Sequence, residues 1–91
     1  MAKILCAVAD GLRKAEATVT VMEYDGTPQH FPLDRGLISS IGGQEAIPVR
    51  ILQYDQTGSL ALVSLPVEAD SGTQRIWVKT EILVTTKERV G

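Results

Sequence analysis

The stretch VMEYDGTPQHF, residues 21–31, has a counterpart thirty positions later in ILQYDQTGSLALV, residues 51–63. Each stretch places Tyr-Asp-x-Thr directly after an apolar segment. Asp and Thr side chains hydrogen-bond to nearby backbone in turns, and a Tyr at a strand end buries its ring while its hydroxyl stays in water. The repeat therefore predicts two β-hairpins with similar turns. Convergence on one turn chemistry and internal duplication both explain the likeness.

The first hairpin is predicted from the residues on both sides of the first Tyr-Asp pair. Val19 and Val21 alternate with Thr residues, so they share one face of an extended strand. The Asp-Gly pair that follows is a strong hairpin signal because glycine adopts positive φ without steric cost. In the returning strand Pro32 lacks an N–H, which predicts that this strand lies at a sheet edge.

The second hairpin is predicted from a longer alternating segment. Ile47, Val49 and Ile51 share one face of the outgoing strand, and a turn with Gly58 follows. The returning segment LALVSL, residues 60–65, is apolar on both faces. Because strands buried on both faces lie inside a sheet, this segment is predicted to be a central strand.

The segments between and after the hairpins give weaker signals. DRGLISSIGG, residues 34–43, predicts a loop with at most one helical turn, stopped by the two glycines. A strand over residues 36–41 is the alternative for this segment. After a polar loop, RIWV (residues 75–78) predicts a strand, KTE breaks the pattern, and ILVTT (residues 82–86) resumes it.

Length and composition predict one small all-β domain. The chain has 91 residues and 44% hydrophobic residues, which argues for a single folded core. We expect residues 1–86 to form the domain and residues 87–91 to be a frayed tail. No segment has the pattern of a long helix, and the chain is short for a sandwich. The expected fold is a small antiparallel β-barrel of five to six strands, with an extra N-terminal strand and at most a single helical turn.

The order of elements in the last half of the chain resembles that of small SH3-like barrels. The hairpin VRILQYDQTGSLALVSLP is followed by a polar loop and then by QRIWV, KTE and ILV. SH3-like domains end in this way, with a strand, a tight helical turn and a short final strand, and a Trp-Val pair before the turn is frequent in bacterial members. The resemblance covers about residues 46–84 and implies a barrel fold. It does not imply binding of Pro-rich peptides, because the acidic loop and paired Tyr of that groove are missing.

Charge and reactive residues argue against several functional classes. With 9 basic and 11 acidic residues, the chain has little charge for nonspecific nucleic-acid binding. A single Cys6 and a single His30 allow neither an internal disulfide nor a Cys/His metal cluster. We interpret Cys6 as a small core residue and His30 as an exposed strand residue, and expect no cofactor, no membrane segment and no enzymatic activity. A lone thiol fits a cytoplasmic setting.

Arg75, Trp77 and Lys79 form the one constellation that suggests a binding site. Their alternation places them on one face of a strand. This face is either structural, with the cations lying over the indole ring, or a protein contact, or a surface that stacks a nucleic-acid base. Tyr24 and Tyr54, at the two predicted turns, are further candidate binding residues.

The N-terminal segment KILCAVA, residues 3–9, suggests a partner. It has no charge between Lys3 and Asp10, and such an apolar edge must pair with the domain's own sheet or with another chain. A homodimer through this strand is one expectation. The expected function is a non-catalytic protein-interaction or assembly module. The alternative is a nucleic-acid-binding barrel that uses Arg75, Trp77 and Lys79.

Overall fold

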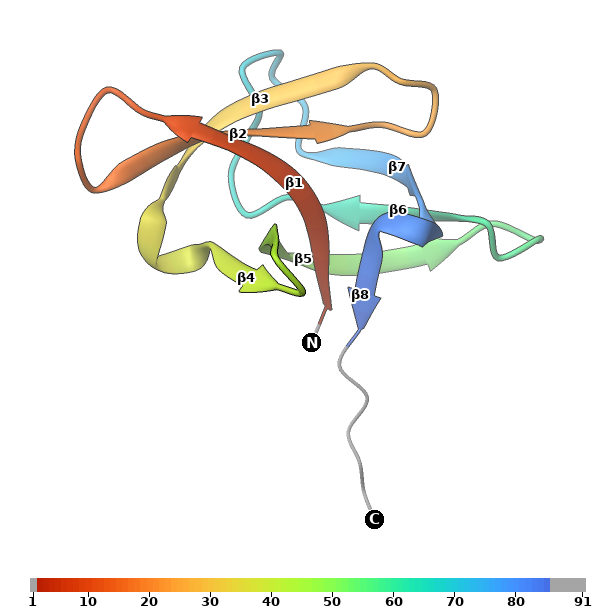
Figure 1. Ribbon diagram of the computed structural model, residues 1–91. Helices are drawn as coiled ribbons and strands as arrows, with labels where there is room; N and C mark the ends of the chain where they lie inside the picture. The colour runs from red at the N-terminus through yellow and green to blue at the C-terminus, as the bar shows by residue number, and fades with distance from the viewer. Residues whose placement is uncertain (1, 86–91) are drawn as a thin grey trace.

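The computed structural model describes residues 2–85, and it consists of antiparallel strands with two short 3-10 turns (Figure 1). The strands are β1 Ala2–Asp10, β2 Glu16–Met22, β3 Pro28–Asp34, β4 Ser39–Ile41, β5 Gln44–Tyr54, β6 Leu60–Ser64, β7 Arg75–Lys79 and β8 Leu83–Thr85. The 3-10 turns are η1 Arg35–Leu37 and η2 Thr80–Ile82. The all-β prediction is confirmed. The strand count exceeds the expected five to six and the helical turns exceed the expected one. Residues 87–91 lie outside the described residues.

The strands form one curled sheet with the order β3-β2-β1-β5-β6-β7, and Figure 1 shows it as a half-barrel. β4 pairs with β5, and β8 pairs with β1. β1 is shared by three strands: residues 2–6 pair with β5, residues 2–4 also pair with β8, and residues 7–10 pair with β2. The N-terminal strand therefore pairs within its own chain, which is one of the two alternatives left open by the sequence.

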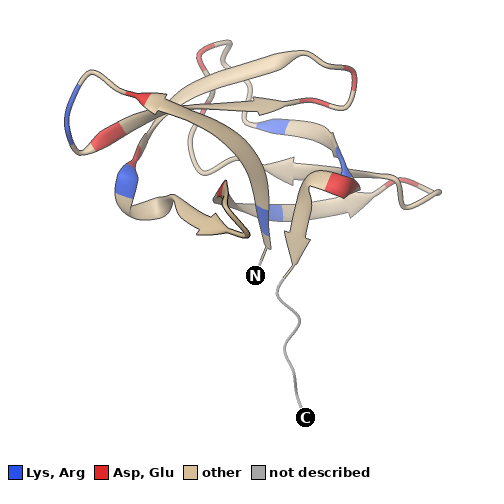
Figure 2. Ribbon diagram, in the orientation of Figure 1, with Lys and Arg blue, Asp and Glu red and all other residues tan. Residues whose placement is uncertain are grey.

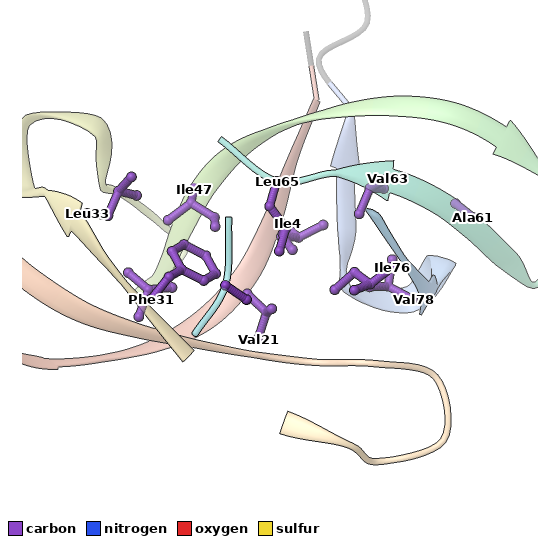
Figure 3. Close-up of a cluster of buried hydrophobic side chains, with 12 residues drawn as sticks. Ile4, Val21, Phe31, Leu33, Ile47, Ala61, Val63, Leu65, Ile76 and Val78 are labelled. Carbon is purple, nitrogen blue, oxygen red and sulfur yellow. The ribbon is translucent and has the colours of Figure 1, made fainter. Parts of the chain in front are cut away.

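The core lies on the concave face of the sheet (Figure 3). Along β2 and β3 every second residue is buried, including Val19, Val21 and Phe31. Val49 and Ile51 are half-buried and pack against the same cluster. The buried cluster comprises Ile4, Val19, Val21, Phe31, Leu33, Ile47, Ala61, Val63, Leu65, Ala69, Ile76 and Val78. Both predicted hairpins thus cover one shared apolar centre, as the alternation indicated.

The two hairpin turns use the repeated Asp in different ways. In the first turn, the Asp25 carboxylate accepts the N–H of Thr27 (3.0 Å). In the second, the Asp55 carboxylate accepts the N–H of Leu60 (3.1 Å) and the hydroxyl of Thr57. The same Tyr-Asp-x-Thr letters therefore close two different loops, which agrees better with convergence on turn chemistry than with duplication.

The Gly42-Gly43 pair forms a hairpin turn and does not stop a helix, so that prediction was wrong. Both glycines have positive φ, 59° and 84°, and Ile41 pairs with Gln44 across them. A two-residue type I′ hairpin turn requires positive φ at both central positions, and glycine adopts it without strain. Both alternatives for this segment are partly correct, since the helical turn η1 is followed after one residue, Ile38, by the strand β4.

The β2–β3 hairpin is held against the β6–β7 side of the sheet by polar contacts. The Tyr24 N–H donates to the Trp77 carbonyl, and the Asp70 N–H donates to the His30 carbonyl, each at 2.8 Å. The buried Gln29 accepts the Ser71 hydroxyl (2.7 Å), and its amide donates to the Glu23 carboxylate. A buried amide needs such partners to offset its lost hydration. These bonds close the curled sheet over the core.

Ile4→Val should destabilise the protein by about 0.5–1.5 kcal/mol, since it removes one buried methylene and leaves a small cavity. Ile4 is fully buried and faces Ile47 of β5 and Leu83 of β8. Urea denaturation measures the change in the free energy of unfolding. The matched control is Leu12→Val at a fully exposed loop position, which should change this free energy by less than about 0.5 kcal/mol. Equal losses in both variants would contradict the assigned core.

The protein should lose stability as the pH falls below about 4, because two turn carboxylates have lowered pKa values. The Thr27 side chain and N–H lower the pKa of Asp25. Burial acts to raise the pKa of Asp55, but hydrogen bonds from Leu60, Thr57, Gly58 and Ser59 outweigh it and the pKa is lowered. The unfolded chain therefore takes up protons first, and the stabilisation present above the ordinary carboxyl pKa disappears as the pH falls through the folded values. Denaturation curves at about pH 5 and about pH 2.5 measure this loss. It should be smaller for Asp55→Asn, and an unchanged loss in that variant would remove Asp55 from the explanation.

Candidate functional site

The convex side of strands β5, β6 and β7 carries the predicted constellation. Alternation in β7 buries Ile76 and Val78 and turns Arg75, Trp77 and Lys79 outward. The register aligns the β6 residues Leu60, Leu62 and Ser64 with them, and Arg50 of β5 lies across from Ser64. We call the outward surface formed by Arg50, Leu60, Leu62, Arg75, Trp77 and Lys79 the β7 face.

The β7 face has an apolar centre with cations around it. Leu60, Leu62 and Trp77 are half-buried, whereas Arg75 and Lys79 are exposed. These two cations are the two end residues of β7, and Figure 2 colours such positions blue on the ribbon. Within residues 2–85 the one ion pair joins Arg35 to Asp10 (3.0 Å), so no described carboxylate neutralises a cation of this face by direct contact. Charged heads beside a partly exposed Trp are typical of a contact surface.

A shallow depression of about 220 Å³ lies at one end of the β7 face. Its walls are Tyr24, Asp55, Leu60 and Trp77. Tyr24 reaches this place because its backbone N–H binds the Trp77 carbonyl, and the residue is 47% exposed. The structure thus brings together one residue from each Tyr-Asp repeat, the Tyr of the first and the Asp of the second.

Tyr54 lies outside this site, although the sequence analysis gave both Tyr24 and Tyr54 as candidate binding residues. It lies across from Ala61, whose side chain is buried on the concave side, and it is 50% exposed at the end of β5. The reason is a β-bulge between Ile51 and Gln53. An extra residue in one strand reverses the faces of all later residues, so Tyr54 and Arg50 lie on opposite sides of the sheet.

The sequence analysis missed four members of the site, namely Arg50, Asp55, Leu60 and Leu62. Their places depend on the pairing of β5 with β6 and on the bulge, neither of which a local pattern specifies. Burial acts to raise the pKa of Asp55, but hydrogen bonds from Leu60 and Thr57 hold its carboxylate in place and outweigh burial, so the pKa of Asp55 is lowered. Asp55 fixes a negative charge in the wall of the depression, at the end of the β7 face away from Arg50.

Two further depressions lie where a long strand changes neighbours. One, of about 320 Å³, is lined by Pro48, Val49, Arg50, Ser64, Leu65 and Pro66, where β5 passes from β4 to β6. The other, of about 450 Å³, lies where β1 passes from β8 to β2, and it includes Leu5, Cys6, Met22 and Ile82. This second groove is mostly apolar, and nothing in the sequence pattern indicated it.

The reactive residues do not converge on a shared site in the described chain. His30 is exposed, and its Nδ1 lies 2.9 Å from the Thr20 hydroxyl. Cys6 is half-buried and packs against the core, as interpreted. Among residues 2–85 no three His, Cys, Asp or Glu side chains gather closely enough to hold a metal ion. The helical segments of that range are three-residue turns, so none has the length to cross a membrane.

Comparison of the chain with protein-family models, with curated proteins and with solved structures finds no match.

Cys6 should react slowly with disulfide reagents in the folded protein. Burial, and then the negative charge of Glu45, raise the pKa of the Cys6 thiol from 9.0 to about 11. The thiolate is the attacking species, so a rise of two pKa units lowers its population by about 100-fold, while its higher nucleophilicity restores about tenfold. We expect a net rate about tenfold below that of the unfolded chain at about pH 8, measured with an aromatic disulfide reagent. Glu45→Gln should increase the folded rate, and equal folded and unfolded rates would contradict this environment.

Proposed function

We propose that the protein is a non-catalytic protein-interaction module whose β7 face docks another protein. The observation that supports this proposal is an outward Trp and two outward Leu residues on paired strands, with three cations around them. Trp and Arg are enriched among residues that dominate binding energy, and apolar centres with polar rims are typical of interfaces. A cytoplasmic setting belongs to the same proposal.

The partner in this proposal is a different protein and not a second copy paired through β1. Residues 2–6 of β1 already pair with β5, and residues 7–10 pair with β2. A two-fold contact through the β7 face would pair residue i of one copy with residue j of the other. Sedimentation of the protein over a range of concentrations separates that outcome from binding of a different protein.

Binding of single-stranded nucleic acid is the second candidate function. It is favoured by the proximity of Tyr24 and Trp77 in one depression, because bases stack on aromatic rings while neighbouring cations contact phosphates. The net charge of −2 and the Asp55 carboxylate in the wall of the depression oppose it. Strong salt dependence of binding would support this candidate over the first.

Selection of random twelve-residue peptides displayed on phage tests the protein-interaction proposal. We expect enriched peptides that bind the wild type and bind Leu62→Thr/Arg75→Glu at least about tenfold more weakly, a loss of about 1.4 kcal/mol. The matched control is Leu37→Thr/Arg13→Glu, which makes the same chemical changes outside the β7 face and should bind like the wild type. Circular dichroism and urea denaturation verify that all variants fold. No enrichment, or equal binding by both double variants, would overturn the proposal.

A further inference from the structure

We infer that the β7 face recognises an acidic segment of a partner protein, in which a carboxylate lies two residues from an apolar or aromatic anchor. This inference rests on the proposed function and specifies the chemistry of its partner. The anchor fills the depression of Tyr24, Leu60 and Trp77, and the carboxylate lies between Arg50 and Arg75.

The size of the depression selects one side chain as its occupant. At about 220 Å³ it is smaller than the roughly 300–1,000 Å³ of pockets that hold drug-sized ligands. Three of its four walls are the apolar surfaces of Tyr24, Leu60 and Trp77. Aromatic rings prefer partners that contact them edge to face or in an offset stack. A single Phe, Trp or Leu side chain is therefore the matching anchor.

The charge of the face selects an acidic segment. Arg50 and Arg75 lie on either side of Ser64 in neighbouring strands, and strands are about 4.8 Å apart, so their Cα atoms are separated by roughly 10 Å. Two long guanidinium side chains can converge on one carboxylate across this separation. Neither guanidinium is in an ion pair with a described residue.

The positions of the charged residues also determine how far the partner's carboxylate lies from its anchor, and at which end of the β7 face the carboxylate lies. Arg75 and Trp77 are two residues apart in β7, which is about 6.6 Å along a strand. An extended partner has the same repeat, so its carboxylate and its anchor are separated by one residue. The acidic residue lies on the Arg75 side, because Asp55 lies in the wall of the depression and would repel it there.

The surroundings of Lys79 favour a short acidic segment over a nucleic acid. Lys79 lines a neighbouring depression together with Glu23 and Glu81. A polyphosphate chain that continues past Trp77 would meet these carboxylates and Asp55. A peptide with its negative charge only on the Arg75 side avoids all three.

The inference is tested with the intact protein and three defined probes. These are a seven-residue peptide with Glu-Ser-Phe at its centre, the same peptide with Lys in place of Glu, and an eight-nucleotide oligo(dT). Binding is followed by the fluorescence of Trp77, the one Trp of the chain, and by NMR shifts of its indole N–H up to millimolar peptide. We expect the Glu peptide to bind at least about tenfold more tightly than the Lys peptide, as the charge complementarity requires.

Two further comparisons test the inference: reversal of the charge at Arg75, and a matched pair of Tyr variants. Arg75→Glu should reverse the preference in favour of the Lys peptide, whereas Arg13→Glu should leave it unchanged. Tyr24→Ala should weaken binding of the Glu peptide about fivefold or more, as loss of an aromatic contact predicts. Tyr54→Ala, at the equivalent position of the repeat and equally exposed, should have no effect.

Several outcomes would overturn the inference. They are equal binding of the two peptides, the absence of Glu-peptide binding, an unchanged preference in Arg75→Glu, and tighter, strongly salt-dependent binding of oligo(dT). Failure of this inference about an acidic partner can be distinguished from failure of the proposed function. If the displayed peptides depend on Leu62 but are neutral or basic, the interaction module stands and only the acidic partner is rejected.

Discussion

The contact between the β2–β3 hairpin and β7 is the constraint on which both the core and the outer face depend. The Tyr24 N–H binds the Trp77 carbonyl, and buried Gln29 ties the same hairpin to the loop before β7 through Ser71. β7 is an edge strand that pairs only with β6, and these bonds place the hairpin beside its free edge. Covering an edge in this way limits its pairing with other chains. The same bond places the Tyr24 ring beside Trp77. This backbone contact therefore ties the β2–β3 hairpin to β7 and also places Tyr24 in the wall of the depression on the convex side.

Two long strands explain how a short chain makes a curled sheet. β1 has nine residues and β5 has eleven, and each serves two neighbours in turn along one edge. A strand that changes neighbours must bend, and the sheet opens where the change takes place. The two larger depressions lie at these places, near Cys6 on β1 and near Arg50 on β5. These two depressions thus result from the way in which β1 and β5 each pair with two strands along one edge.

Local sequence patterns predicted most strands and turns, because strand alternation and turn formation depend on residues that are close in sequence. Alternation gave the buried faces of both hairpins, Pro32 indicated an edge strand, and the order strand, turn, strand at residues 75–85 is observed. The Gly42-Gly43 pair was misread because two adjacent glycines suit either a helix end or a tight hairpin. Only the pairing of β4 with β5 decides between these, and β4, with three residues, is too short to be recognised alone.

The candidate site could be predicted only in part, because its composition depends on one extra residue in β5. In a regular strand Arg50 and Tyr54 would share a face, since they are an even number of residues apart. The bulge between Ile51 and Gln53 reverses this relation and leaves Gln53 level with Leu62 on the convex side. The second Tyr of the repeat is thereby removed from the β7 face, and its neighbour Asp55 contributes in its place. Two Tyr-Asp-x-Thr segments consequently supply different side chains to one surface, and the register of the sheet decides which residue of each segment lies there.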